Sequence, residues 1–512
     1  MHNMRTIALI IATLISGAAL AQQPGKVTKK YFPDPQVEIA TPAFTKKHPR
    51  VTSYKQMMRF LEQLVAANPS IMTMEVIGQT QRGKAIPAVY VSKGQSEGKV
   101  KVLYSARVHG DEPASTEGML YLLERMANDS QMQQLLDRIE LVVVPMVNID
   151  GGERLNRASA NGIDLNRDMS KLMAPESRAL RAIFNRFNPD VAIDFHEFLA
   201  LRADFATLDK NSYNLSNPFD AMFLYSGNLN VAPAIRDITK SLFVAQAQKD
   251  FTRAGYTFHD YYTTDKAFGS VTFNVGGSSA RSTSNAFSLS NSISILMEIR
   301  GVRMGNTSLK RRVHTTYTVA QSYLQTAYSH ADRVKAAIAE ANASEHEVVV
   351  KASPKKVEGY VLPFIDLERN TTKELAVSAS LNLEATPTLV RQRPEAYYIA
   401  PTEKLAAEKL QQLGIEVDTL TAPLTVDVEA YRVERISEAG RSTDGIRTLS
   451  VATTVSRKSV TLPAGSFKVS MQQRRASMAA AMLEPEAPNG FVFFRIVEPA
   501  LNAELPVYRF TK

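Results

Sequence analysis

Two clusters of histidine and glutamate follow apolar segments of this sequence. His109 and Glu112 come directly after the apolar run 100–108, and His196 ends a second run, 191–195. Two imidazoles and one carboxylate form a typical catalytic zinc site, which keeps a fourth position for water. Because parallel strands end at one edge of a sheet, the three side chains can meet there. Either cluster alone is also typical of a polar turn, so the metal-site prediction depends on their combination.

A polar loop rich in arginine lies between the two clusters. It contains Arg154, Arg157, Asp164, Asn166 and Arg167, and several glycines. Arginine binds carboxylates through two parallel hydrogen bonds and stabilises a developing oxyanion. A solvated loop has a similar composition, so the functional interpretation rests on the position of this loop between two candidate ligand clusters.

A carboxylate interrupts the apolar strand pattern at 293–299. This residue, Glu298, is followed by Arg300, and burying an unpaired carboxylate is costly. Two interpretations remain open. Either Arg300 neutralises Glu298 as a structural ion pair, or Glu298 faces the metal and acts as a general base.

Composition limits the class of protein. The 512 residues are 44% hydrophobic and 22% charged, typical of a globular chain of about two or three domains. There is no cysteine, which excludes disulfides, thiol catalysis and thiolate-ligated metals. The net charge of +9 is not concentrated in one segment, so we expect no nucleic-acid partner.

Residues 1–21 have the pattern of a secretory signal peptide. Arg5 precedes an apolar stretch at 7–15, and a small-residue cleavage motif at 19–21 precedes Gln22. The apolar stretch is shorter than the ~20 residues that span a bilayer. We therefore expect an exported bacterial protein, periplasmic or secreted, without stable membrane insertion after cleavage.

Strand and helix patterns alternate through residues 51–343, the expected catalytic domain. They predict an α/β fold with a mixed, largely parallel sheet flanked by helices. Residues 22–50 are rich in proline and lysine and are expected to form an extended leader. Short β-branched runs with Pro/Gly turns at 344–512 predict a smaller, β-rich accessory domain.

In their order along the chain, these motifs resemble the zinc metallocarboxypeptidase family typified by pancreatic carboxypeptidase A. The resemblance spans roughly residues 52–341, and the C-terminal region is similar to a β-rich extension of some bacterial members. It implies one Zn²⁺ per chain, a carboxylate that hydrogen-bonds to one ligating imidazole and fixes it, a general base and a group that stabilises the oxyanion. The residues that match these roles are His109, Glu112 and His196 for the metal, Asp164 for the carboxylate that fixes His109, Glu298 for the base and Arg157 for the oxyanion.

The resemblance also implies substrate contacts. Asn166 and Arg167 match the residues that bind the terminal carboxylate of a peptide, with Arg154 nearby. Arg281 lies in the loop that lines the pocket for the terminal side chain, where it could bind a carboxylate.

The sequence departs from carboxypeptidase A at two places. Asp111 stands where that enzyme has an arginine, so a contact to the upstream part of the substrate is missing or reversed in charge. The loop 276–287 lacks the family's mobile tyrosine, and Tyr256, Tyr261 and Tyr262 lie further back and match it poorly. We expect this loss to weaken substrate binding more than the zinc chemistry.

The leading hypothesis is an exported zinc metallocarboxypeptidase that hydrolyses the C-terminal bond of peptides. Three alternatives remain: a carboxypeptidase or endopeptidase of peptidoglycan stem peptides, a deacylase of N-acyl amino acids, and a non-catalytic binding protein that retained the fold. The last alternative predicts the loss of a metal ligand or of Glu298, and all four residues are present. The oligomeric state is left open.

Overall fold

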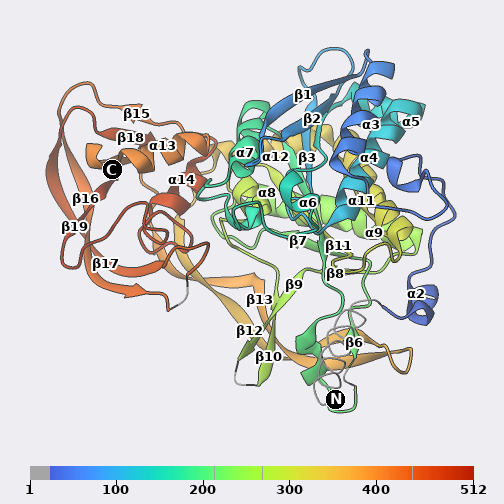
Figure 1. Ribbon diagram of the computed structural model, residues 1–512. Coiled ribbons are helices and arrows are strands. Elements are labelled where there is room, and N and C mark those ends of the chain that lie inside the picture. Colours follow the sequence, from blue (N-terminus) through green and yellow to red (C-terminus); the bar gives the residue numbers. More distant parts are fainter. Residues whose placement is uncertain (1–22, 213, 268, 441, 512) are drawn as a thin grey trace, which may run out of the picture.

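The computed structural model describes residues 23–212, 214–267, 269–440 and 442–511. The predicted signal peptide lies outside this part of the chain. Figure 1 shows a large α/β body and a second, β-rich body that contains the C-terminus. Along the described segments, no helix combines the length and the apolar character needed to cross a bilayer.

The α/β body is built on an eight-stranded sheet of order β1-β2-β4-β3-β5-β11-β7-β8. Its inner strands β4, β3, β5 and β11 are parallel, and antiparallel pairs join β1, β2 and β7 to them. The strands are β1 (Met72–Gln79), β2 (Ala85–Val91), β3 (Val100–Ala106), β4 (Ile139–Val144), β5 (Val191–Phe198), β7 (Ala221–Tyr225), β8 (Phe258–Asp260) and β11 (Ile293–Arg300). The mixed, largely parallel sheet confirms the predicted fold class.

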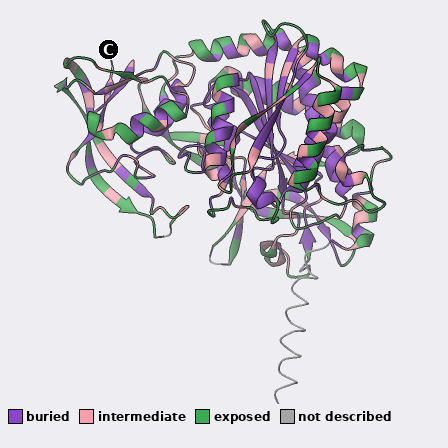
Figure 2. Cartoon of the chain, turned by 45° about the horizontal axis from the view of Figure 1, so that its top comes forward, coloured by how far each residue is buried: buried purple, intermediate pink, exposed green. Residues whose placement is uncertain are grey.

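Helices cover both faces of this sheet, with α4 and α11 together on one side and α7 on the other (Figure 1). The inner strands are buried along their length, as Figure 2 shows, because helices lie on either side of them. The helices are α3 (Tyr54–Ala67), α4 (Pro113–Asn128), α5 (Ser130–Gln134), α6 (Ile149–Gly152), α7 (Pro175–Phe187), α8 (Pro233–Ile238), α9 (Ala245–Ala254), α10 (Thr283–Ser288), α11 (Leu309–Ser329) and α12 (Ala331–Ala343).

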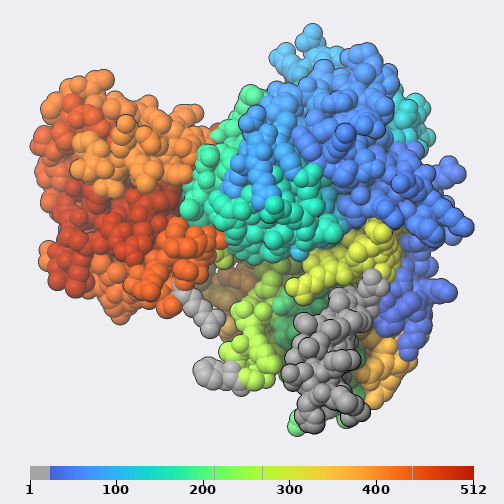
Figure 3. Space-filling model, in the orientation of Figure 1, coloured from blue at the N-terminus to red at the C-terminus, as the bar shows by residue number. Residues whose placement is uncertain are grey.

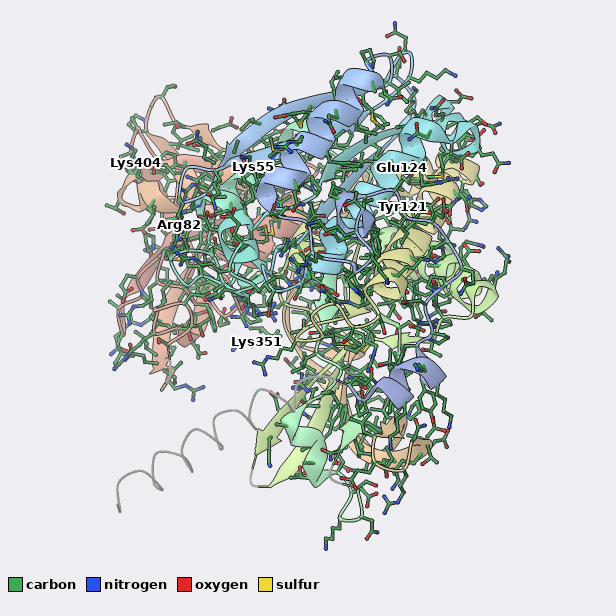
Figure 4. The ribbon with its side chains drawn as sticks, turned by 45° about the vertical axis from the view of Figure 1, so that its right-hand side comes forward. Lys55, Arg82, Tyr121, Glu124, Lys351 and Lys404 are labelled. Carbon is green, nitrogen blue, oxygen red and sulfur yellow. The ribbon has the colours of Figure 1, made fainter. Side chains whose placement is uncertain are left out.

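Local sequence explains how the first of these helices forms. Ser53 and Gln56 form a reciprocal capping box at the start of α3, which satisfies backbone donors that the helix leaves unpaired. Met57 and Leu61 of α3 are buried, whereas Lys55 lies on its outer side (Figure 4). An amphipathic helix of this kind covers the sheet and leaves its charged face in water.

Two helical segments are divided, and the leader differs from the sequence-based expectation. The helical pattern at 309–341 is two helices that meet at His330, and six π-helical residues, 239–244, separate α8 from α9. The leader is not extended throughout, because α2 (Gly25–Tyr31) forms within it. Val27 of α2 is buried in a small apolar cluster with Ile365 and Leu367, and this tertiary packing stabilises a helix of weak local pattern.

A second sheet, of order β6-β12-β13-β10-β9, crosses the predicted domain boundary at residues 343 and 344. The long hairpin that follows this boundary pairs with earlier strands, and Figure 1 shows it beside β9 and β10. The strands are β6 (Leu215–Ser216), β9 (Tyr262–Ala267), β10 (Ser270–Val275), β12 (Val348–Asp366) and β13 (Thr371–Arg391).

The β-rich body contains a six-stranded antiparallel sheet of order β15-β18-β14-β19-β16-β17. Two helices accompany this sheet, and the body adjoins the α/β body (Figure 3). Its elements are β14 (Ala396–Ile399), α13 (Lys404–Gln412), β15 (Asp418–Thr419), β16 (Leu424–Glu438), β17 (Leu449–Leu462), β18 (Phe467–Ser470), α14 (Ala476–Leu483) and β19 (Glu504–Phe510).

Candidate metal centre and substrate-binding loop

The structure brings together the three predicted metal ligands. His109 and Glu112 lie in the turn between β3 and α4, and His196 lies in the neighbouring strand β5. The Nδ1 atom of His109 lies 2.7 Å from Oε1 of Glu112 and 3.0 Å from Nδ1 of His196. The Nδ1 atom of His196 lies 2.8 Å from Oε2 of Glu112. All three residues are buried, and one ligand atom of each lies within 4.8 Å of the others.

A glycine allows the turn that carries two of these ligands. A Cβ atom on Gly110 would lie 2.2 Å from the carbonyl carbon of Gly151. The backbone of the following loop therefore packs directly against this position, and a side chain would push the turn away. Nε of Arg107 donates to the Gly110 carbonyl over 3.1 Å, which also stabilises the turn.

A carboxylate fixes each of the two imidazoles. Nε2 of His109 lies 3.0 Å from Asp164 Oδ1, and Nε2 of His196 lies 2.7 Å from Asp194 Oδ2. Because an ionised carboxylate only accepts hydrogen bonds, each Nε2 is the donor, and in the neutral imidazole each Nδ1 then carries a lone pair. Two nitrogen lone pairs and the Glu112 carboxylate thus face one another, and this donor set fits a bound Zn²⁺.

Asp164 was predicted from the sequence, whereas Asp194 was not. Asp194 is fully buried, and Ser105 Oγ donates to its Oδ1 over 2.8 Å. A signal was available, because residues two apart in a strand point to the same face of the sheet, and Asp194 precedes His196 by two.

Arg157 lies beside the ligand group. Its Nη2 lies 3.0 Å from Asp164 Oδ2, and its Nη1 lies 3.6 Å from Glu112 Oε1. The side chain is 46% exposed, so one end of it remains available to a bound molecule. A guanidinium held in this way places a fixed positive charge at the edge of the candidate metal centre.

Glu298 lies next to the candidate ligand His196, because the two residues are register partners in the parallel strands β11 and β5. Burial, and then the negative charge of Glu112, raise the pKa of the Glu298 carboxyl to about 7. Arg300 does not pair with Glu298. It donates to the Asn217 carbonyl over 2.8 Å and packs 4.0 Å from the centre of the Phe32 ring. The structure therefore disfavours the ion-pair interpretation of Glu298.

Asn166 is oriented by the first residue of α10. The backbone N–H of Thr283 donates to Asn166 Oδ1 over 2.9 Å, so the amide NH₂ of Asn166 points elsewhere. Oγ1 of Thr283 donates to Asp194 Oδ2 over 2.5 Å. A continuous buried hydrogen-bond network therefore links Asn166 to His196 through Thr283 and Asp194.

The other predicted substrate residues are spread along the rim of this site. Arg167 donates from Nη1 to the Asn166 carbonyl over 2.9 Å, and the Arg281 carbonyl accepts from Met169 N over 3.1 Å. Burial, and then the positive charge of Arg167, lower the pKa of Arg281, so these two guanidinium groups lie in one region. Arg154 is exposed, and among the described residues no ion pair joins it to the ligand group.

Tyr261, which matches the family's mobile tyrosine poorly in sequence, lies close enough to Glu298 for the two charges to interact. Tyr261 lies just before β9, and its backbone N–H donates to the Phe223 carbonyl over 2.9 Å. Burial, and then the negative charge of Glu298, raise the pKa of the Tyr261 phenol, and the charges of Arg157 and Arg167 oppose this rise. The phenol therefore comes from a different segment than the loop in which the family carries its mobile tyrosine.

The chain is similar to known proteins in sequence and in fold. The zinc carboxypeptidase family matches residues 57–376. Carboxypeptidase 2 from Trichophyton rubrum is 29% identical over 470 residues, which cover 90% of this chain and 86% of that protein. Carboxypeptidase D from Homo sapiens is 30% identical over 148 residues, which cover 26% of this chain and 11% of that protein.

A metallo-carboxypeptidase structure from Burkholderia cenocepacia superposes with a TM-score of 0.42 and 18% identity, covering 55% of this chain and 69% of that one. The family match, by contrast, extends over more than half of the chain and includes all three converging ligands and Glu298. This chain therefore belongs to the zinc carboxypeptidase family, a family of metal-dependent peptide hydrolases.

Proposed function

We propose that this protein is an exported carboxypeptidase that hydrolyses the C-terminal peptide bond of peptides. The observation that supports this most is the convergence of His109, Glu112 and His196, with Glu298 on the adjacent strand. His109, Glu112 and His196 would hold a zinc ion, which when bound would supply an activated water and polarise a carbonyl group.

The surrounding residues take the following roles in this proposal. Glu298 removes a proton from the attacking water and later delivers it to the leaving amine. Arg157 stabilises the negative charge that develops on the carbonyl oxygen. Asn166 and Arg167 bind the terminal carboxylate, which positions the last peptide bond at the reacting groups. The remaining substrate contacts are proposed for Arg281, near the terminal side chain, and for Arg154, at the exposed end of the loop.

Cleavage products would test this function directly. We would incubate the mature protein with a mixed peptide pool that includes cell-wall stem peptides, and identify products by mass spectrometry with and without a zinc chelator. We expect loss of single C-terminal residues that stops when the chelator is present. Internal cleavage alone would instead identify an endopeptidase. Bound zinc without peptide cleavage would favour a deacylase or a binding protein.

Removing the Arg167 guanidinium should weaken recognition of the terminal carboxylate. We expect Arg167→Ala to raise KM by about tenfold or more for peptides with a free C-terminus, because a hydrogen bond between charged groups contributes about 1.5–3 kcal/mol. KM for the amidated form of the same peptide should change little. Arg82→Ala, at an exposed turn, is the control. Equal changes for both peptides would contradict the assignment.

Asp194 should hold His196 in its metal-binding orientation. We expect Asp194→Asn to weaken zinc affinity by about 10- to 100-fold, the usual cost of losing an outer carboxylate partner. Competition with a fluorescent chelator measures this affinity without using activity. Asp332→Asn, at an exposed site, is the control. Unchanged zinc affinity in Asp194→Asn would show that His196 needs no such partner.

Export and the domain division remain part of the proposal. The signal-peptide pattern of residues 1–21 supports export, and a mature chain that begins at Gln22, found in the periplasm of a bacterial host, would establish it. A mature protein that retains its first residues in the cytoplasm would contradict it. We also retain 344–512 as the accessory domain.

A further inference from the structure

The β-rich body contacts the loop that holds Asn166 and Arg167, here called the substrate-binding loop, at a buried lysine. Lys171 follows the 3₁₀ turn that holds Asn166 and Arg167, and it is only 1% exposed. Its Nζ donates to the Arg167 carbonyl over 2.5 Å and to Asp444 Oδ2 over 2.9 Å. It also lies 4.4 Å from the centre of the Phe494 ring. Asp444 and Phe494 both belong to the β-rich body.

A buried ammonium group is stable only when its charge and its donors are matched. The β-rich body supplies the carboxylate of Asp444 and the ring face of Phe494, both of which favour a cation. The α/β body supplies the carbonyl of Arg167. The position of Lys171 therefore depends on Asp444, which lies 273 positions further along the chain, and on Phe494. The position of the Arg167 backbone depends on them through Lys171.

Other hydrogen bonds also join the β-rich body to the α/β body. Lys409 Nζ donates to the Leu172 carbonyl over 3.2 Å, at the end of the substrate-binding loop. Arg474 Nη2 donates to the Asn291 carbonyl over 3.1 Å, three residues after α10 ends. The Asn166–Thr283 hydrogen bond joins the loop to the start of α10. The β-rich body thus contacts the end of the substrate-binding loop and the chain that follows α10.

We propose that the β-rich body positions the carboxylate-binding site of the peptidase, and that Asp444 and Phe494 do so by holding Lys171 against the Arg167 backbone. The inference rests on the proposed function, because it assigns Asn166 and Arg167 to the substrate carboxylate. Asp444 and Lys171 are positioning residues, since they act on substrate only through the loop. The β-rich body is then a required part of substrate recognition.

The test uses the full-length chain with zinc bound. We expect Asp444→Asn to raise KM for a peptide with a free C-terminus by about tenfold, while kcat changes by less than about threefold. KM for the amidated peptide and the zinc content should stay at the wild-type values. Asp427→Asn, on an exposed position of β16, is the matched control and should match wild type.

A second pair of variants separates positioning from folding. Phe494→Leu keeps the salt bridge and should raise the same KM by a smaller factor. Lys171→Met should raise the same KM as Asp444→Asn does. The double variant should raise KM little further, because both substitutions remove the same Lys171–Asp444 salt bridge. Unchanged KM in Asp444→Asn, or equal changes for the free and amidated peptides, would overturn the proposal. A wild-type chain that releases no C-terminal residues would instead overturn the proposed function.

Discussion

Replacing Glu298 by glutamine is expected to lower kcat by about 10³-fold while zinc stays bound. Glutamine preserves the size of the side chain but cannot accept a proton from water or deliver one to the leaving amine. The three candidate metal ligands lie on β5 and in the β3–α4 turn, so a change on β11 leaves their contacts intact. The variant therefore separates proton transfer from metal binding.

The measurement is single-turnover hydrolysis of a free-carboxylate peptide, together with the zinc content of the same sample. Glu124→Gln, on the outer side of α4, controls for the loss of a carboxylate elsewhere (Figure 4). Because the base acts in its ionised form, wild-type activity should fall as pH falls through the pKa of Glu298. A bound divalent cation lowers that pKa, so this acidic limb is expected below pH 7. Wild-type kcat in Glu298→Gln would show that another group moves the proton.

The ligand group was predictable because its positions depend on local patterns. His109 and His196 follow continuous apolar runs, which are typical of buried parallel strands, and such strands end at the same edge of a sheet. The pairing of β3 with β5, and of β5 with β11, then places Glu298 beside His196. Strand periodicity and sheet topology were sufficient for this part of the site.

The supporting residues were not predictable in the same way. Asp194 receives hydrogen bonds from Ser105 and Thr283, each of which is 89 residues away in the sequence. Lys171 meets Asp444 across an even longer separation. Neither periodicity nor turn chemistry encodes such pairings, because they arise only when whole elements pack. Tyr261 was missed for the same reason, since it reaches the site from the segment before β9.

Substituting Arg157 should also lower the catalytic rate strongly. We expect Arg157→Ala to lower kcat by about 10²- to 10³-fold, the usual result of removing one oxyanion-stabilising donor. The structure holds this guanidinium in place, because its Nε and Nη2 both bond to Asp164 Oδ2, at 3.2 and 3.0 Å. Its charge is therefore fixed before substrate binds, and no reorganisation is needed when the oxyanion forms.

Arg157→Lys distinguishes charge from geometry at this position. Lysine retains the positive charge but not the planar fork, so it cannot hold Asp164 and face the oxyanion at once. We expect kcat of Arg157→Lys to lie between those of wild type and Arg157→Ala, with zinc content unchanged in both variants. Arg82→Ala, on an exposed turn, is again the control. A change confined to KM would place Arg157 in substrate binding, and loss of zinc would show that its main role is to hold Asp164 against His109.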